Sequence, residues 1–368
     1  MSQALEQSGF GKFLTSKTGK LIVSLVVLVA VIIAIYQSFI FMRDSEASKF
    51  SIALIALVVG IGGIWALLWS LNNFVDSFPE RVRNFLRPFV FAGPGALILG
   101  LYLVFPTIYT LYQSFMNRTT TEFVGLENYA FIFTDPEMLV VLRNTVMWVV
   151  LVPAVAVSLG LLIAVMTDRL RPTWEKVSKS LIFLPLAISF VGASVIWRFV
   201  YYYQPPGAEQ IGLLNAIVTA LGGDPVAWLI QRPWNNLFLI FIMIWLQTGF
   251  AMVILSASVK GVPKDLLEAA RIDGAGEIRA FFNVTVPYIS GSILTVTTTI
   301  LFLVLKIFDI VYVMTSGRFG TGIVASRFYQ EAFIFRNNGR GAALAIFLLL
   351  VVIPFMVRNV RSMREKRR

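Results

Sequence analysis

Apolar stretches alternate along the chain with polar connections that are rich in glycine, proline, asparagine and charged residues. Eight stretches are long enough to cross a membrane, because a helix needs about 20 mainly apolar residues to span roughly 30 Å of hydrocarbon. The pattern therefore predicts an all-α integral membrane protein with eight transmembrane helices. In chain order the predicted spans are Leu21–Met42, Ser51–Leu71, Pro88–Tyr112, Thr145–Met166, Ser180–Tyr202, Leu237–Ser258, Tyr288–Met314 and Gly341–Val357, the last being short and broken by Pro354.

The composition agrees with a chain that is surrounded mainly by hydrocarbon. Charged residues make up 14% of the chain, against about 25% in soluble domains. The chain has no Cys and no His, which excludes disulfides, thiol nucleophiles, histidine bases and the usual zinc, copper and haem sites. We therefore expect no catalytic residue and no metal site, and an enzyme that uses carboxylates is a minor alternative. The net charge of +11 is more typical of loops beside anionic lipid than of a nucleic-acid partner.

The distribution of Lys and Arg predicts the orientation of the spans. With the N-terminus inside, the five cytoplasmic segments hold 20 basic residues and the four outer segments hold nine. This bias satisfies the positive-inside rule and puts both termini in the cytoplasm, with the basic tail Arg358–Arg368 at the inner face. One outer segment departs from the rule, because Arg318–Arg340 carries four arginines. The first span follows Lys12, Lys17 and Lys20 and is too long for a signal peptide, so we expect a retained helix.

One cytoplasmic connection, Val259–Pro287, is long and internally ordered. A short helix is expected over Lys264–Ile272, and Gly274 ends it because glycine adopts the left-handed conformation at little cost. A second short helix, Glu277–Asn283, is expected to lead through Pro287 into the next span. Four bases balance four acids in this connection, and small residues occupy its centre. That composition favours insertion into a protein groove, and an amphipathic loop on the bilayer is the alternative.

This connection resembles the EAA loop of ABC-transporter importer permeases, and we call it the coupling loop. The family pattern is Glu-Ala-Ala, three residues, Gly, nine residues, an apolar residue, one residue, another apolar residue and Pro. The spacing matches throughout, with valine in place of the commoner isoleucine and leucine, at Glu268, Ala269, Ala270, Gly274, Val284, Val286 and Pro287. The resemblance implies that ATPase coupling falls on Glu268, Ala269, Ala270, Asp273, Gly274 and Pro287.

Other stretches are similar to the carbohydrate-uptake branch of these permeases, the relatives of the maltose permeases. They are Phe123–Tyr129, Asp135-Pro136, Asn144-Thr145, Trp245, and Phe308-Asp309 followed by Thr315 and Gly317. The resemblance runs from about Phe89 to Arg364 and implies a six-helix type I permease core over residues 88–368, with the coupling loop at 259–287. Residues 1–87 are then an N-terminal tail and two accessory transmembrane helices. The connection Gln113–Asn144 is too short for the large outer domain of the eight-span maltose subunit.

The family implies a multi-pass subunit of an importer in the bacterial inner membrane. Its partners would be a second homologous permease, a dimer of cytoplasmic ATPase subunits and an extracytoplasmic solute-binding protein, with a sugar as the transported solute. The chain has no Gly-x-x-x-x-Gly-Lys-Ser/Thr motif, so we expect ATP and Mg to be bound by the ATPase subunits and no cofactor to be bound here. The helix Lys264–Ile272 would dock on the ATPase, whose closure rocks the spans between inward and outward access.

Polar groups inside the predicted spans are candidates for the solute path. Gln247 and Thr248, beside Trp245, form the best cluster for a sugar, and hydrogen bonds between helices are the alternative. Lys306 and Asp309 are one helical turn apart on the seventh span, so they are expected to form a charge pair, either structural or part of a proton relay. The family's sugar-contact positions fall near Met243, Gln247, Leu186, Phe190, Leu303 and Val304, of which only Gln247 can donate or accept a hydrogen bond.

Aromatic residues are expected to anchor the outer end of the fifth span. Trp197 and Tyr201-Tyr202-Tyr203 lie where the membrane interface is predicted, and stacking against a sugar is the alternative.

Two other functions remain alternatives. The same architecture could import glycerol phosphate or a polyamine, although an anionic solute would favour basic residues in the spans, where only Arg198 and Lys306 are candidates. An ion-driven secondary transporter would be expected to show inverted repeats and several buried carboxylates, whereas this chain has one acid within its spans.

Overall fold

The structure, a computed structural model, describes residues 17–45 and 47–365. Lys12 and the last three residues of the predicted basic tail lie outside the described residues. Among the residues described, the elements are helical and the β-structure is a single bridge between Met116 and Phe123. The chain divides into two compact units, Met1–Ile108 and Tyr109–Arg368.

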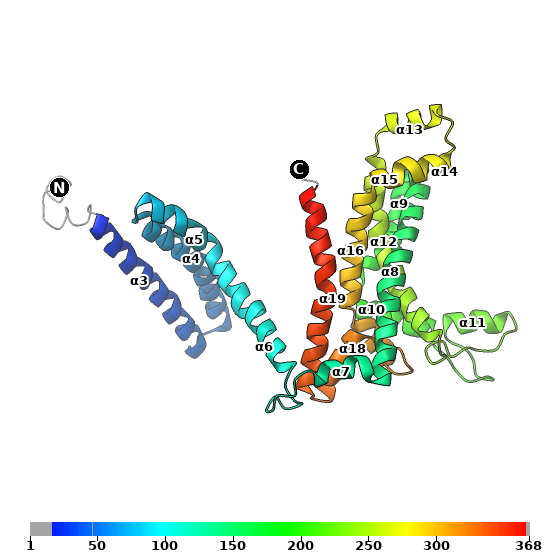
Figure 1. Cartoon of the computed structure of the whole chain (residues 1–368), viewed down its shortest axis with the longest axis horizontal. Helices are drawn as coiled ribbons and strands as arrows, with labels where there is room; N and C mark the ends of the chain where they lie inside the picture. Colours follow the sequence, from blue (N-terminus) through cyan, green and yellow to red (C-terminus); the bar gives the residue numbers. More distant parts are fainter. Residues whose placement is uncertain (1–16, 46, 366–368) are drawn as a thin grey trace. The chain divides into compact units, whose positions relative to one another are not determined.

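The first unit contains the first two predicted spans and most of the third (Figure 1). Helices α3 (Lys17–Asp44) and α4 (Lys49–Asp76) pack against each other, and α5 (Glu80–Leu99) packs on α4. Arg87 donates a hydrogen bond to Asp76 at 3.1 Å across the α4–α5 contact. By its contacts α5 belongs with α4, and this compact unit ends at Ile108.

The third predicted span is longer than the apolar pattern suggested. Helix α5 continues through a π-helical stretch, η1 (Gly100–Val104), into α6 (Phe105–Gln113). The helix runs from Glu80 to Gln113, whereas the expected span was Pro88–Tyr112.

The second unit is a helical bundle around α12 (Asn235–Lys260), which packs against α8 (Pro136–Asp168), α9 (Pro172–Phe183) and α16 (Ser290–Leu305). In its most apolar stretch α12 is 61% buried, more than any other candidate span among the described residues. The remaining helices are α7 (Glu127–Thr134), α10 (Phe190–Val200), α11 (Leu213–Ala220), α13 (Lys264–Ile272), α14 (Glu277–Ala280), α15 (Val286–Tyr288), α17 (Asp309–Thr315), α18 (Val324–Tyr329) and α19 (Asn338–Glu365).

Glycines allow two unusually close helix contacts on α12. A Cβ atom on Gly249 would lie 2.4 Å from the carbonyl oxygen of Ile182 at the end of α9. A Cβ atom on Gly160 of α8 would lie 2.6 Å from the Cβ of Ala251. Small residues let helix backbones approach in this way inside membranes, where association depends on close packing.

A Gly249→Ala variant is expected to be less stable than the natural protein, by about 1–3 kcal/mol, because the added methyl group has no room. The matched control is Gly93→Ala on α5, where a Cβ atom would meet nothing within 4 Å. That change is expected to be neutral or stabilising, since glycine in a helix costs about 0.5–1 kcal/mol relative to alanine. Thermal unfolding in detergent measures both, and an equal melting temperature for the two variants would contradict the close contact.

Two predicted spans are broken rather than continuous. Helices α9 and α10 meet at 102° across the 3₁₀ turn η2 (Leu184–Ala187), so the expected single helix Ser180–Tyr202 is wrong. Pro185 lies in this turn and lacks an N–H for a helical hydrogen bond. The Ser189 side chain then starts α10 by accepting a hydrogen bond from the Gly192 N–H at 3.0 Å.

The expected seventh span, Tyr288–Met314, is also interrupted. Residues 277–288 meet α16 at 69°, and α16 ends at Leu305, before α17 begins at Asp309. Six helices of the described chain are long and apolar enough to cross a membrane, or up to eight if each bent pair is one span. The eighth span is longer than expected, because α19 extends the predicted segment Gly341–Val357 at both ends. Pro354 lies within this helix and does not end it.

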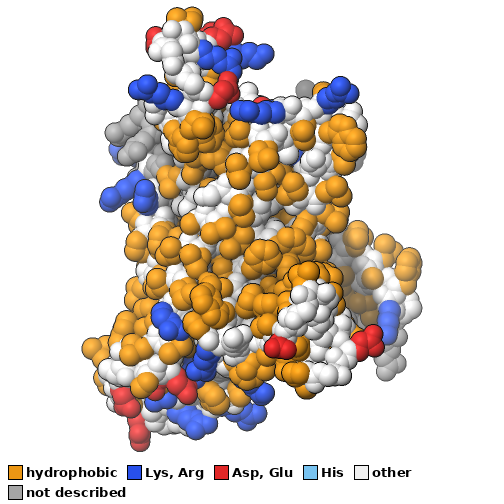
Figure 2. All heavy atoms as spheres, turned by 90° about the vertical axis from the view of Figure 1, so that its right-hand side faces the viewer, with side chains coloured by type: hydrophobic (Ala, Val, Ile, Leu, Met, Phe, Trp, Pro, Cys, Tyr) orange, Lys and Arg blue, Asp and Glu red, His pale blue; other side chains and the backbone are white. Residues whose placement is uncertain are grey.

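The two ends of the second unit differ in what they carry (Figure 1). Helix α13 and the C-terminal end of α19 lie at one end, and α7, α11 and α18 lie at the other. Figure 2 shows charged side chains gathered near the two ends of the face in view, with hydrophobic side chains over the band between them. This distribution is the one expected of a protein that crosses a bilayer.

Two of the four arginines that depart from the positive-inside rule contact other side chains at the end of the unit opposite α13. Arg327 forms an ion pair with Glu331 at 3.0 Å, and Glu331 is buried. The guanidinium carbon of Arg340 lies 3.9 Å from the ring centroid of Phe131, a cation–π contact. Arg327 and Arg340 therefore help to hold the elements at this end together.

Two of the four aromatic residues at the end of α10, Trp197 and Tyr201, pack inside the bundle, whereas Tyr202 and Tyr203 are exposed. Tyr201 is buried, and its hydroxyl donates a hydrogen bond to the Phe238 carbonyl at 3.1 Å. The ring of Trp197 packs against Tyr201 and Trp245 at centroid distances of 5.2 and 5.6 Å. The prediction that Tyr201 anchors at the interface is therefore wrong, because the break in the fifth span turns this side of α10 toward α12.

Candidate functional site

The coupling loop lies at the end of α12, and its middle part, α13, stands clear of the bundle (Figure 1). Its helix α13 has the bounds that the sequence predicted, Lys264–Ile272, with Pro263 as the residue before the first turn. Gly274 has a φ of +81°, the left-handed conformation expected at this position. We call Lys260–Pro263, which starts with the last residue of α12, the first arm of the loop and Asp273–Tyr288 the second arm.

Helix α13 presents an uncovered surface. Glu268 and Ala269 are exposed, Ala270 is half-buried, and Ile272 is 86% exposed at the end of the helix. The end of α13 therefore leaves an apolar side chain uncovered beside charged residues.

The second arm is longer than expected. The predicted helix Glu277–Asn283 continues as α14, a π-helical turn η3 (Phe281–Thr285) and α15, so that it ends at Tyr288. The wide π turn ends two residues before Pro287, a residue that has no N–H for a regular helical hydrogen bond. Pro287 therefore lies in the last turn of the second arm, before the 69° bend into α16.

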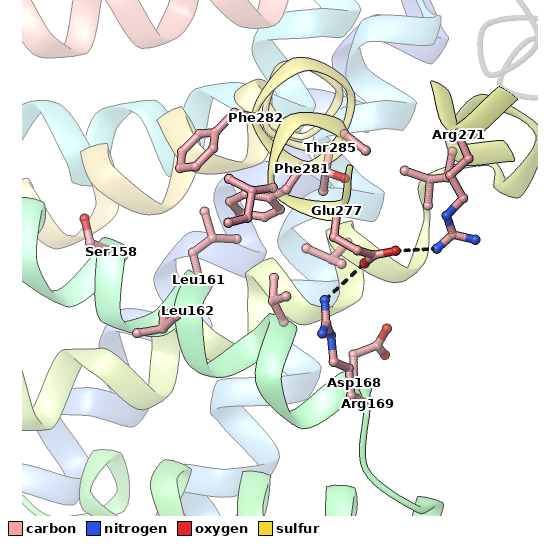
Figure 3. Close-up of a pocket in the computed structure, with 15 residues that line it drawn as sticks. Ser158, Leu161, Leu162, Asp168, Arg169, Arg271, Glu277, Phe281, Phe282 and Thr285 are labelled. Carbon is pink, nitrogen blue, oxygen red and sulfur yellow. Dashed lines mark hydrogen bonds and ion pairs between the residues drawn. The ribbon is translucent and has the colours of Figure 1, made fainter. Parts of the chain in front are cut away.

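A cavity of about 650 Å³ separates the second arm from α8. Its walls are apolar, with Leu161 and Leu162 of α8 on one side and Phe281 and Phe282 of the second arm on the other (Figure 3). At its rim Glu277 accepts hydrogen bonds from Arg169 at 3.2 Å and from Arg271 at 2.9 Å. The sequence did not indicate this cavity, because its two walls are more than 100 residues apart in the chain.

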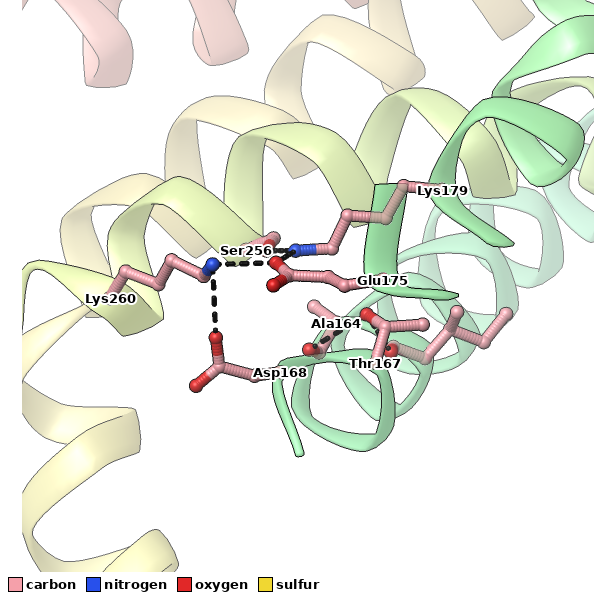
Figure 4. A network of polar contacts seen from close by, with 8 residues as sticks. Ala164, Thr167, Asp168, Glu175, Lys179, Ser256 and Lys260 are labelled. Atoms are coloured by element: carbon pink, nitrogen blue, oxygen red, sulfur yellow. Dashed lines mark hydrogen bonds and ion pairs between the residues drawn. The ribbon is translucent and has the colours of Figure 1, made fainter. Parts of the chain in front are cut away.

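A second group of charges joins three helices beside the first arm (Figure 4). Glu175 of α9 accepts hydrogen bonds from Lys179 and from Lys260 of α12, each at 2.5 Å. Lys260 also pairs with Asp168, the last residue of α8, at 3.4 Å. Lys179 donates a further hydrogen bond to Ser256 of α12. The side chain of Glu175 is only 15% exposed, so this group is partly shielded from water.

A separate cavity of about 470 Å³ lies beside the middle of α12. Gln247 lines it and is 1% exposed, and neither polar atom of its side chain has a hydrogen-bond partner among the described residues. Buried amides are normally satisfied, so an unpaired one at a cavity is a candidate for binding a polar solute. Four of the six positions near which sugar contacts were expected from the resemblance line this cavity: Leu186, Phe190, Gln247 and Leu303.

The other predicted solute residues do not face this cavity. Thr248 donates its hydroxyl hydrogen to the Ile244 carbonyl of its own helix at 2.7 Å. Trp245 packs edge-on against Trp197. Met243 and Val304 are buried in the core.

Lys306 and Asp309 are not a pair. They lie on either side of the break between α16 and α17, and no ion pair joins them in the described part of the chain. Asp309 lines the cavity of Gln247, whereas Lys306 lines a different one, beside α18 and α19. The expectation of one helical face is wrong because residues 306–308 leave the helix. Asp309 is thus a cavity residue that the apolar pattern, which predicted a continuous helix, could not identify.

Comparison with known proteins places the chain among transport proteins. Residues 140–363 match the family described as "Binding-protein-dependent transport system inner membrane component". The chain is 55% identical over 277 residues to the osmoprotective compounds uptake permease protein GgtC of Synechocystis sp., covering 75% of this chain and 99% of that protein. It is 45% identical over 326 residues to the alpha-glucoside transport system permease protein AglF of Rhizobium meliloti, covering 84% and 96%.

A solved structure has the same fold. It is the crystal structure of a bacterial ABC transporter involved in the import of the acidic polysaccharide alginate, with a TM-score of 0.66. The likeness covers 77% of this chain and 99% of that chain at 20% sequence identity, so it concerns the fold alone.

Proposed function

The chain belongs to the family of inner-membrane components of binding-protein-dependent transport systems, and we propose that it lines the solute path of an ATP-driven importer for neutral sugars such as α-glucosides. It is a permease subunit with a role in sugar uptake. The proposal that the solute is a neutral sugar rests on the unpaired, buried amide of Gln247 at an otherwise largely apolar cavity. Sugars are bound by a few polar groups and apolar faces in cavities of this kind.

The proposed partners follow from the family and from what this chain lacks. A second permease would complete the solute path, and a solute-binding protein would deliver the sugar. A pair of ATPase subunits would bind ATP and Mg, since the chain carries no phosphate-binding loop. The exposed helix α13, with Glu268, Ala269 and Ala270 uncovered or half-covered, is the surface proposed to enter the ATPase.

The proposed topology has eight spans, counting each bent pair as one, and both termini in the cytoplasm. The end of α19 lies on the same side of the second unit as α13, which supports a cytoplasmic C-terminus (Figure 1). The excess of basic residues in the predicted cytoplasmic segments supports the same orientation.

A neutral solute is favoured over an anionic one. The described lining of the Gln247 cavity contains the carboxylate of Asp309 and no Lys or Arg. An anion such as glycerol phosphate would be repelled by that carboxylate and would find no cation there. A polyamine is the alternative, because its positive charges would be attracted to the carboxylate. Competition between a polyamine and the sugar for uptake distinguishes the two solutes.

The function is tested in proteoliposomes that hold the complete complex with its binding protein. ATP inside the vesicles is expected to drive uptake of radiolabelled sucrose or trehalose, both α-glucosides, and an imposed proton or sodium gradient is not. Uptake driven by an ion gradient without ATP would identify a secondary transporter. Competition by a polyamine but by neither sugar would contradict the proposed solute class.

A Gln247→Ala variant is expected to raise the KM for sugar roughly three- to tenfold, because a hydrogen bond of this kind contributes about 0.5–1.5 kcal/mol. The matched control is Thr248→Val, the next residue, whose hydroxyl bonds only within its own helix. That variant is expected to keep the natural KM. Equal uptake kinetics for all three proteins would remove Gln247 from the solute path.

A further inference from the structure

Helix α8 ends at Asp168 and is followed directly by Arg169, a residue of opposite charge, and each of the two reaches a different arm of the coupling loop. Asp168 pairs at 3.4 Å with Lys260, the residue from which the first arm leaves α12 (Figure 4). Arg169 pairs at 3.2 Å with Glu277, which begins α14 in the second arm (Figure 3). The end of a single helix is thus joined to both arms.

Each of these contacts continues into a neighbouring helix. Lys260 also pairs with Glu175 at 2.5 Å, which joins α9 to the first arm. Glu277 also pairs with Arg271 at 2.9 Å, which joins the last turn of α13 to the second arm. The charged side chains therefore form a continuous connection from α13 to α8 and α9.

The backbone of the loop is held locally, as by the hydrogen bond from the Ala275 N–H to the Ala270 carbonyl at 2.9 Å, but this bond joins α13 to the second arm and not to α8. Glycine lies in the first arm at Gly261 and in the second arm at Gly274 and Gly276, and glycine bends more easily than other residues. A Cβ atom on Gly274 or Gly276 would meet nothing within 4 Å, so no packing restrains these two positions. If the arms were held by the backbone alone, a displacement of α13 would bend the glycine positions and leave the bundle where it was.

We propose that Asp168 and Arg169 are positioning residues that clamp both arms of the coupling loop to α8, so that movement of α13 is transmitted to the bundle. The proposal rests on the proposed function, since it concerns how ATP-driven movement reaches the solute path. Exposed ion pairs contribute little to stability, and Arg169 and Glu277 are 69% and 62% exposed. Loss of the clamp is therefore expected to affect coupling much more than folding.

The chain has no cysteine, so a pair of introduced cysteines can replace the contact with a removable covalent bond. The variant carries Arg169→Cys together with Glu277→Cys and is assembled with its partners in proteoliposomes. Without a cross-linker, it is expected to hydrolyse ATP within about twofold of the natural rate while sugar uptake per ATP falls at least about fivefold. A short bis-methanethiosulfonate cross-linker is expected to restore at least half of the natural ratio, and a reducing agent to abolish it again.

The controls separate the clamp from a general loss of structure. Each single cysteine variant, treated with the same reagent, is expected to stay uncoupled. Arg279→Ala removes an exposed arginine of the second arm that has no ion pair within the described chain, and it is expected to couple normally. A parallel fall in hydrolysis and uptake, normal coupling without the cross-linker, or no recovery with it would each overturn the clamp.

A different result would contradict the proposed function. A natural complex that hydrolyses ATP but takes up neither labelled sucrose nor labelled trehalose contradicts the solute class and says nothing against the clamp. In that case the coupling readout is the stimulation of ATP hydrolysis by the binding protein. The uncoupled double variant is expected to lose this stimulation at least about fivefold and to regain it on cross-linking.

Discussion

A Glu268→Lys variant is expected to lose its ATPase subunits during purification and to take up almost no sugar. Glu268 is exposed on α13, on the surface that we propose to enter the ATPase. Reversing a charge at such an interface costs about 2 kcal/mol or more, which corresponds to a roughly 30-fold weaker association. The ratio of ATPase to permease in the purified complex measures the effect directly.

The control for this change is Glu209→Lys, which reverses an exposed acid in the connection between α10 and α11. That residue lies far along the chain from the coupling loop, and its reversal is expected to leave the subunit ratio unchanged. An unchanged ratio for Glu268→Lys as well would mean that α13 does not hold the ATPase.

A Gly274→Leu variant is expected to assemble normally but to lose most of its transport. A side chain in the left-handed conformation costs about 1–2 kcal/mol, and the strain is relieved by turning α13 away from its natural direction. Because about 1.4 kcal/mol corresponds to a factor of ten, uptake is expected to fall about tenfold. Expression level and ATP-driven uptake, measured together, separate this loss from poor folding.

The chain supplies a closely matched control for Gly274. Gly222, in the connection after α11, has the same φ of +81°, and a Cβ atom there would also meet nothing within 4 Å. Gly222→Leu therefore introduces the same local strain at a position away from α13. Normal uptake by both variants would falsify the role of Gly274, and equal losses in both would attribute the effect to general strain.

The sequence predicted best the features that depend on local chemistry. Helix α13 has its predicted bounds, because Pro263 and Gly274 act within one or two residues of themselves. The longest apolar stretches are helices, since only a helix satisfies its own backbone inside hydrocarbon. The family resemblance was carried by the same short segment and is confirmed by a match over residues 140–363.

Sequence reasoning failed where tertiary contacts decide the course of the backbone. Average hydropathy is the same for a straight span and for one broken at Pro185, so the 102° bend between α9 and α10 was not predicted. The break at residues 306–308 separated Lys306 from Asp309 and brought only Asp309 to the cavity of Gln247. The ion pairs of Asp168 and Arg169 join positions about 90 to 110 residues away, which no local pattern indicates.

The glycine contacts of α12 have a consequence for how such permeases diversify. One side of α12 packs closely against α9 at Gly249 and against α8 at Ala251. There is no room for a larger side chain at Gly249, or at Gly160 of α8, which faces Ala251. Replacements that change the solute are therefore expected on the side of α12 that borders the cavity rather than at these close contacts. The transported solute can then change through single replacements around Gln247, while the close contacts of α12 with α8 and α9 stay the same.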